Sequence, residues 1–131
     1  MVDVGNVTTI AIVDDDESVR TAMKGLIESL GYIVVAFASG AEFLASDRLS
    51  ECACLVSDVR MPGMGGLELQ KRLMASGRSI PMIFITAFPD TRVRDRAMKA
   101  GAIAFLSKPC ERDDLLAHLR TAVASRSSGG N

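Results

Sequence analysis

The sequence predicts one α/β domain with a doubly wound, five-stranded parallel sheet and five helices. Short apolar segments that suit strands alternate along the chain with longer segments whose apolar residues recur at helical spacing. The strand segments are apolar almost throughout, which is typical of a parallel sheet covered by helices on both faces. With 131 residues, 48% of them hydrophobic, the chain is long and apolar enough to bury one core.

Three strand segments and two helical segments fill the first half of the chain. Residues 8–13 (TTIAIV) are apolar and stop at a run of acids, and residues 33–37 (IVVAF) are rich in β-branched side chains, which favour strands. Between them, residues 17–30 carry apolar side chains at helical spacing and stop before Gly31, a residue type that often ends helices. The other two elements of this half are a short helix and a third strand, at 40–49 and 54–57 (CLVS).

The second half continues the same alternation. A turn rich in Pro and Gly (MPGMGG, 61–66) precedes a helix over 67–76, and residues 82–85 (MIFI) form the fourth strand. Asp90 suits the N-cap of a helix that ends near residue 100. The last two elements are a strand over 103–106 and a helix over 111–125, whose apolar residues form one stripe.

The rest of the chain shows no second domain. No Pro-, Gly- or Ser-rich linker divides it, so we expect an ordered domain over 8–124 with flexible ends at 1–7 and 125–131. We see neither a signal peptide nor an apolar stretch long enough to span a membrane. The three cysteines, an odd number, are interpreted as reduced thiols of a cytoplasmic protein: Cys52, Cys54 and Cys110.

The charge balance of the chain excludes two classes of protein. The chain has 15 Lys and Arg against 16 Asp and Glu, a formal net charge of −1. This near-neutral balance excludes a nucleic-acid binder held mainly by bulk charge, and also a polybasic protein of the membrane surface.

Polar residues gather at the strand ends. The first strand stops at Asp14–Asp16, the third at Asp58, the fourth at Thr86 and the fifth at Lys108. A strand order of 2-1-3-4-5 places the first and third strands side by side, so these acids would meet at the rim where such sheets bind ligands. Clustered carboxylates need a cation, and Mg²⁺ prefers oxygen ligands. A carboxylate can also accept a phosphoryl group as a nucleophile, assisted by a metal ion and a positively charged side chain.

Four segments give these residues a family context: IVDDDESVR (12–20), SDVRMPGMGGLEL (57–69), FITAF (84–88) and AMKAGAIAFLSKP (97–109). In these segments the chain resembles the receiver domain of bacterial two-component response regulators, in particular the FixJ-like group. The resemblance covers roughly residues 8 to 124. It implies the flavodoxin-like and CheY-like fold.

The resemblance assigns roles at the site. It implies that Asp58 is the phosphoacceptor, that Lys108 pairs with the phosphoryl group through an ammonium aimed by a cis bond to Pro109, and that Thr86 donates a hydrogen bond to it on activation. Phe105 would be the aromatic side chain that rotates when Thr86 moves. The implied ligands of Mg²⁺ are Asp15, Asp58, the backbone carbonyl of Arg60, and Asp14 through water.

The same resemblance implies a phosphorylation-controlled switch and not a turnover enzyme, because the domain would catalyse only its own phosphorylation and dephosphorylation. A histidine kinase or a histidine phosphotransfer protein would supply the phosphoryl group. The fourth helix, fifth strand and fifth helix would form the surface that changes, on a monomer that can dimerise through it when phosphorylated. We expect no direct contact of this domain with nucleic acid or a membrane. Whether it stands alone or belongs to a longer FixJ-like transcriptional regulator stays open.

Two other functions share parts of this pattern. A small aspartyl-phosphate phosphatase would use the same nucleophile, and Asp14 and Asp16 satisfy its DxD pair, but the chain leaves no room for a substrate cap. A flavodoxin-like FMN carrier needs a hydroxyl- and Gly-rich loop after the first strand, where this chain has acids. Both are therefore disfavoured.

Some neighbouring residues have simpler interpretations. Asp16 and Glu17 suit the positive end of a helix dipole. His118, the only histidine, lies beside the apolar stripe of the last helix and is interpreted as a packing residue. Phe88 is bulky and follows Thr86 by two residues, which leads to the hypothesis that Phe88 and Arg60 hinder the hydrolytic water at the phosphoryl group.

Overall fold

The computed structural model describes residues 8–129, with side chains to residue 125. The predicted flexible segment 1–7 and the last two residues of the predicted tail lie outside the described residues. The strands are β1 (Thr9–Val13), β2 (Ile33–Phe37), β3 (Cys52–Ser57), β4 (Met82–Thr86) and β5 (Ala104–Ser107). The helices are α1 (Glu17–Ser29), α2 (Gly40–Ala45), the short 3-10 helix η2 (Leu49–Glu51), α3 (Gly66–Ala75), α4 (Thr91–Lys99) and α5 (Arg112–Gly129).

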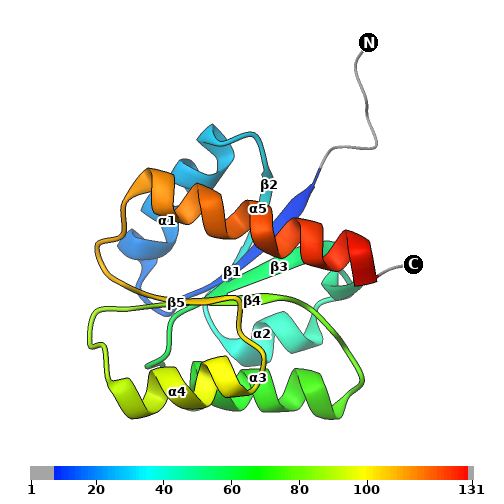
Figure 1. The fold of residues 1–131 in the computed structure, drawn as a ribbon, viewed down its shortest axis with the longest axis vertical. Helices are drawn as coiled ribbons and strands as arrows, with labels where there is room; N and C mark the ends of the chain where they lie inside the picture. The colour runs from blue at the N-terminus through cyan, green and yellow to red at the C-terminus, as the bar shows by residue number, and fades with distance from the viewer. Residues whose placement is uncertain (1–7, 130–131) are drawn as a thin grey trace.

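The five strands form one parallel sheet in the order β2-β1-β3-β4-β5. Figure 1 shows α1 and α5 on one side of this sheet and α2, α3 and α4 on the other. The predicted doubly wound α/β fold and its strand order are therefore confirmed. The order makes β1 and β3 direct neighbours, so the residues that follow them lie side by side.

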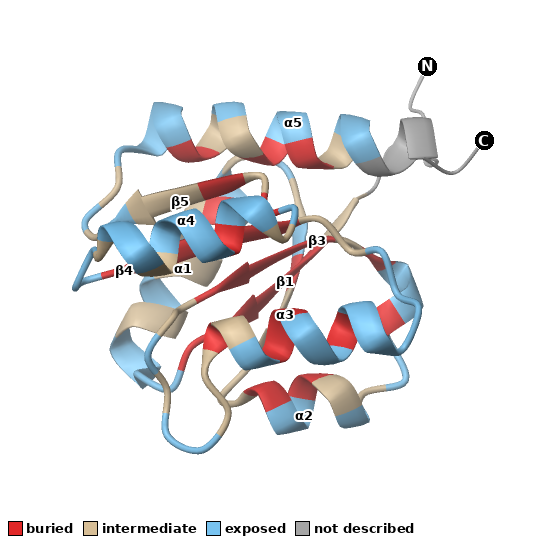
Figure 2. Cartoon of the chain, turned by 60° about the horizontal axis from the view of Figure 1, so that its bottom comes forward, coloured by how far each residue is buried: buried red, intermediate tan, exposed pale blue. Residues whose placement is uncertain are grey.

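Two apolar layers hold the helices to the sheet, and the buried strands between them are plain in Figure 2. The layer under α1 and α5 contains Ile27, Leu115 and Leu119, all fully buried. The layer under the other three helices contains Phe43 from α2 and Leu69 from α3. Burial on both faces explains why the strands are apolar at nearly every position.

Two predicted helix ends are wrong by four residues each. The helix predicted over 40–49 ends at Ala45, because the Ser46 hydroxyl accepts the backbone N–H of Arg48 at 3.0 Å and a local bond of this kind competes with the helix. The helix predicted over 111–125 continues to Gly129 in α5, since adding a turn to a formed helix costs little. The boundary of the ordered domain near residue 124 and the flexible tail after it stay predictions.

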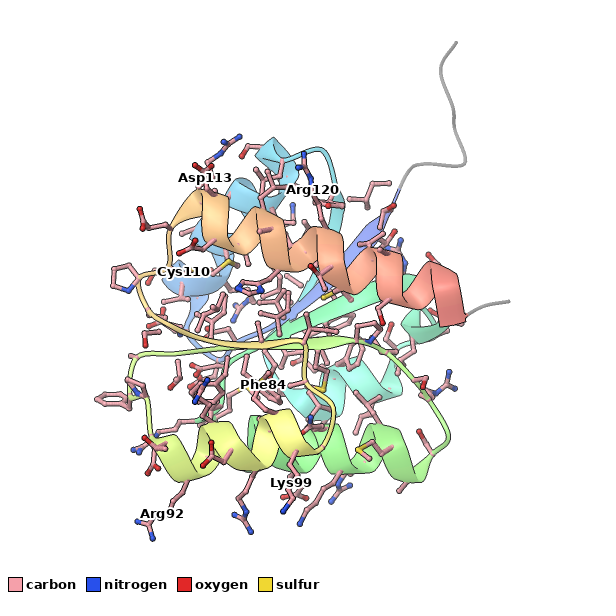
Figure 3. All side chains as sticks on the ribbon, in the orientation of Figure 1. Phe84, Arg92, Lys99, Cys110, Asp113 and Arg120 are labelled. Carbon is pink, nitrogen blue, oxygen red and sulfur yellow. The ribbon has the colours of Figure 1, made fainter. Side chains whose placement is uncertain are left out.

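No disulfide joins the three cysteines, all of which the structure describes. Cys52 and Cys54 are buried in β3, whereas Cys110 is half-buried on the loop that leads into α5 (Figure 3). Burial raises the pKa of the Cys54 thiol and of the Cys110 thiol. Across residues 8–129, every helix is too short or too polar to cross a membrane.

Candidate functional site

Three carboxylates meet at the carboxyl end of the sheet. Asp14 directly follows β1 and Asp58 directly follows β3, and the two strands are neighbours. Each of Asp14, Asp15 and Asp58 offers a carboxylate oxygen within 4.8 Å of the others. Asp14 is buried, Asp58 is half-buried and Asp15 is exposed, so the cluster opens to solvent at one side.

Lys108 brings a positive charge to these acids from the loop after β5. Its Nζ lies 3.0 Å from Oδ2 of Asp14 and 3.1 Å from Oδ2 of Asp58. The Lys108–Pro109 peptide bond is cis. Burial alone lowers the pKa of the Lys108 ammonium, but the hydrogen bonds to the two carboxylates outweigh it and raise the pKa above its usual value. Lys108 therefore stays charged between the two acids.

The second carboxylate oxygen of Asp14 and of Asp58 is held by the backbone. Oδ1 of Asp14 accepts the N–H of Asp16 at 2.9 Å, and Oδ1 of Asp58 accepts the N–H of Val59 at 2.7 Å. These bonds orient both carboxylates so that Oδ2 faces Lys108. The contact with Lys108 thus joins β1, β3 and the loop after β5 at one point.

Asp16 belongs to the helix and not to this cluster. Its Oδ1 accepts the N–H groups of Ser18 at 2.9 Å and Val19 at 3.2 Å, which makes it the N-cap of α1. The hydroxyl of Ser18 also donates to it, and these bonds lower the pKa of Asp16. The expected place of this acid at the N-terminus of a helix is confirmed.

Thr86 and Phe105 lie on adjacent strands next to the site. The Thr86 side chain is buried, and its Oγ1 accepts the N–H of Phe88 at 3.1 Å. Phe105 is half-buried, and its ring centroid lies 6.3 Å from that of Phe84. In this structure the Thr86 hydroxyl therefore holds the backbone of the loop that follows β4.

Two side chains at the mouth of the site contact each other. Arg60 follows Asp58 by two residues and Phe88 follows Thr86 by two residues, on loops after the neighbouring strands β3 and β4. Cζ of Arg60 lies 5.1 Å from the centroid of the Phe88 ring, which is a cation–π arrangement. Phe88 is 64% exposed. The two residues thus form a cover beside the acids that neither sequence position reveals alone.

Sequence reasoning missed two supports of the acids. Nη1 of Arg20, on α1, donates to the backbone carbonyl of Asp14 at 2.7 Å. The hydroxyl of Ser57 donates to the backbone carbonyl of Asp58 at 2.8 Å, and Ser57 is buried. Arg20 and Ser57 both lie in the segments that carry the family resemblance. Their hydrogen bonds go to backbone carbonyls, and no pattern of residue types in the sequence predicts such bonds.

Gly66 packs against the backbone of the loop that begins at Asp58. Its replacement tests how tightly this loop is packed. A Cβ on Gly66 would overlap the backbone carbonyl oxygen of Asp58 and lie 3.0 Å from Cε1 of Phe84. We expect Gly66→Ala to lower the free energy of unfolding in urea by about 1–3 kcal/mol, the usual cost of overpacking. The control is Gly25→Ala on α1, where no atom lies within 4 Å and a gain of up to about 1 kcal/mol is expected. Equal stability of the two variants would contradict this prediction.

The comparisons with known proteins agree with this geometry. The model of the response regulator receiver domain family matches residues 10–120. The chain belongs to the response regulator receiver domain family. The fold, the bacterial relatives and the motifs at the strand ends all fit this family.

The relatives of this receiver domain are response regulators. It is 44% identical over 116 residues to the response regulator protein TmoT of Ectopseudomonas mendocina, covering 88% of this chain and 53% of the relative. It is 39% identical over 114 residues to the transcriptional regulatory protein FixJ of Bradyrhizobium diazoefficiens, covering 87% and 56%. The chain therefore spans about half the length of the curated relatives it matches.

Solved structures of response regulators also resemble this chain. The response regulator StyR superposes with a TM-score of 0.86 at 43% identity, covering 93% of this chain and 62% of that chain. The FixJ-N structure superposes with a TM-score of 0.81 at 35% identity, covering 95% and 96%. Receiver domains of two-component systems are signalling modules, and neither the phosphatase nor the FMN carrier is favoured.

Proposed function

We propose that this receiver domain accepts one phosphoryl group on Asp58 from a histidine kinase or a histidine phosphotransfer protein. The observation that carries the proposal is the position of Lys108, whose ammonium contacts Oδ2 of both Asp14 and Asp58. A charged group there can stabilise the phosphoryl oxygens as negative charge develops on them. Asp58 supplies the nucleophilic oxygen, the P–N bond to the donor histidine breaks, and the imidazole nitrogen keeps the electron pair.

The donor set at the site fits Mg²⁺. All three clustered side chains offer carboxylate oxygens, the ligand type that this ion prefers, and one or two carboxylates with water molecules satisfy its coordination. We propose Asp15, Asp58 and the backbone carbonyl of Arg60 as direct ligands, with Asp14 acting through water. When bound, the ion supplies positive charge next to the transferred group.

The switch follows from the charge that phosphorylation adds. A phosphoryl group on Asp58 gives Lys108 a new anionic partner and gives the Thr86 hydroxyl an acceptor in place of its present contact with Phe88 N–H. Phe105 then rotates into the space that Thr86 leaves. The surface of α4, β5 and α5 changes with them and recruits a partner or a second copy of the domain.

Outside this chemistry the domain is a switch and not a turnover enzyme. It would act in the bacterial cytoplasm, and hydrolysis of the phosphoaspartate by water would reset it. Because the relatives are about twice as long as this chain, the output of the whole protein is a separate proposal: either a DNA-binding half follows in a longer regulator, or the domain acts alone through protein partners.

The test is incubation with acetyl phosphate and Mg²⁺, followed by intact-mass measurement. We expect the mass of one phosphoryl group to be gained with Mg²⁺ present and to be absent when EDTA removes the ion. Acetyl phosphate is a small-molecule donor, so the experiment reports the chemistry of the domain without the kinase. A chain that gains no phosphoryl group in Mg²⁺ would overturn the proposal.

The cover formed by Arg60 and Phe88 leads to a prediction about the lifetime of the phosphorylated state. Removing the ring in Phe88→Ala frees Arg60 and opens a path for the hydrolytic water. We expect dephosphorylation to become roughly two- to fivefold faster, which is what the loss of an exposed cation–π contact allows. Phosphate release from the phosphorylated variant and from wild type measures this. Equal rates would sink the hypothesis.

A further inference from the structure

One buried polar residue has no part in the phosphorylation site. Within residues 8–125, where burial is described, four polar or charged residues are buried: Asp14, Ser57, Gln70 and Thr86. The first two and the last lie at or beside the acids, whereas Gln70 lies on α3, away from them. A buried carboxamide costs free energy unless it forms a hydrogen bond, so the partner of Gln70 indicates why it is there.

The partner is the backbone of α4. Nε2 of Gln70 donates to the carbonyl oxygen of Ala97 at 3.2 Å, and Gln70 is only 6% exposed. The same carbonyl accepts the N–H of Ala102 at 3.0 Å, in the turn that ends the helix. Gln70 therefore binds α4 near its C-terminal end.

Few side chains of α4 are buried against the domain. Ala97 is the one buried residue of this fully described helix, and Val93 and Ala100 are half-buried beside it. Figure 2 shows most of the α4 surface exposed, and the labelled Arg92 and Lys99 point away from the domain in Figure 3. Small side chains bury little apolar area, so the hydrogen bond from Gln70 matters more here than it would under a helix packed by leucines.

The junction of α3 and α4 is also incompletely filled. Two surface hollows of about 280 Å³ each flank it, and Gln70 and Ala100 line both. Leu73 of α3 packs in the same apolar cluster as Ala97, and the carboxamide of Gln70 adds a hydrogen bond across the junction between these hollows.

The opposite end of α4 is connected to the phosphorylation site. Oγ1 of Thr86 accepts the N–H of Phe88, and the exposed residues 87–89 lead to Asp90, whose side chain accepts the N–H of Arg92 at 2.8 Å and caps α4. A displacement of Thr86 therefore reaches α4 at its N-terminal end, through a short and exposed loop.

We propose that Gln70 is the anchor of a hinge. It fixes the C-terminal end of α4 to α3, so that movement of Thr86 swings the N-terminal end of the helix about the Ala97 carbonyl. The proposal rests on the proposed function for the source of the movement, but the anchor itself exists in the resting protein. Gln70 thus sets how far the α4 surface turns when the domain is phosphorylated.

The first arm of the test uses resting protein and residue-resolved hydrogen exchange. The reporters are the amides of Ala100, Gly101 and Ala102, which are bonded to the last carbonyls of α4. In Gln70→Leu and Gln70→Met, whose side chains have no hydrogen-bond donor for the Ala97 carbonyl, we expect these amides to exchange roughly fivefold faster. The control Arg72→Leu changes an exposed residue of the same helix that lines neither hollow, and it leaves the exchange of these amides unchanged. Wild-type protection in both Gln70 variants would overturn the anchor.

The second arm uses protein phosphorylated with acetyl phosphate and checked by intact mass. In wild type we expect exchange to change at Arg92 and Arg94 and to stay constant at Ala100, Gly101 and Ala102, whereas in Gln70→Leu both ends change. Equal changes at both ends of wild-type α4 would overturn the hinge. A chain that gains no phosphoryl group refutes the proposed function and the hinge with it, while the resting-state arm still decides the anchor.

Discussion

Asp58→Asn is expected to abolish the gain of a phosphoryl group from acetyl phosphate and Mg²⁺. The carboxamide of Asn lacks the anionic oxygen that attacks phosphorus, and the change also removes one of the three clustered carboxylates. The fold should survive, because a carbonyl oxygen at the Oδ1 position can still accept the N–H of Val59. Intact mass under the conditions that phosphorylate wild type measures the effect.

The matched control for that substitution is Asp16→Asn. Asp16 stands in the same run of acids, but it caps α1 and takes no part in the cluster. We expect this variant to gain one phosphoryl group as wild type does, since Asn is also a good N-cap. Phosphorylation that persists in Asp58→Asn would place the acceptor elsewhere and contradict the assignment.

Lys108→Met is expected to slow phosphorylation by acetyl phosphate roughly 10²–10³-fold, the usual loss when one preorganised group that stabilises transition-state charge is removed. Met keeps much of the length and apolar surface of the lysine stem but has no charge. The variant also leaves Oδ2 of Asp14 and of Asp58 without their ammonium partner. We therefore expect it to bind Mg²⁺ more tightly than wild type, because Lys108 no longer competes for these oxygens.

The slower phosphorylation and the tighter binding of Mg²⁺ expected for Lys108→Met are measured separately. Time courses of intact mass give the phosphorylation rate, and titration with Mg²⁺ gives the dissociation constant. Lys24→Met is the control, because Lys24 forms an exposed ion pair with Glu28 on α1, and such pairs contribute little. A wild-type phosphorylation rate in Lys108→Met would show that the ammonium does not act on the transferred group.

Topology explains why much of the site could be predicted from the sequence. Parallel strands end at the same edge of a sheet, so a strand order that makes β1 and β3 neighbours brings Asp14 and Asp58 together before any side-chain geometry is known. Lys108 follows the same logic at the end of β5. What the residue types alone left open was which oxygen faces which nitrogen, since that depends on the backbone N–H groups of Asp16 and Val59.

The features that the sequence did not reveal depend on contacts between distant segments. Gln70 and Ala97 are 27 residues apart, and nothing in a helical pattern distinguishes a glutamine that faces another helix from one that faces solvent. The contact of Arg60 with Phe88 needs the relative position of two loops. The early end of α2 was missed for a different reason, because a single hydroxyl, that of Ser46, outweighs a weak helical pattern.

The burial of the cysteines determines how the proposed switch can be followed in solution. Cys52 and Cys54 are buried, so Cys110 is the accessible thiol among the three cysteines of the sequence, all of which the structure describes. Its raised pKa means that a thiol-reactive fluorophore would attach slowly at neutral pH and faster as the pH rises, because the thiolate is the reactive form. Cys110 follows Lys108 by two residues. The unmodified chain thus carries its own attachment point for a dye two residues from Lys108, and real-time fluorescence needs no engineered cysteine.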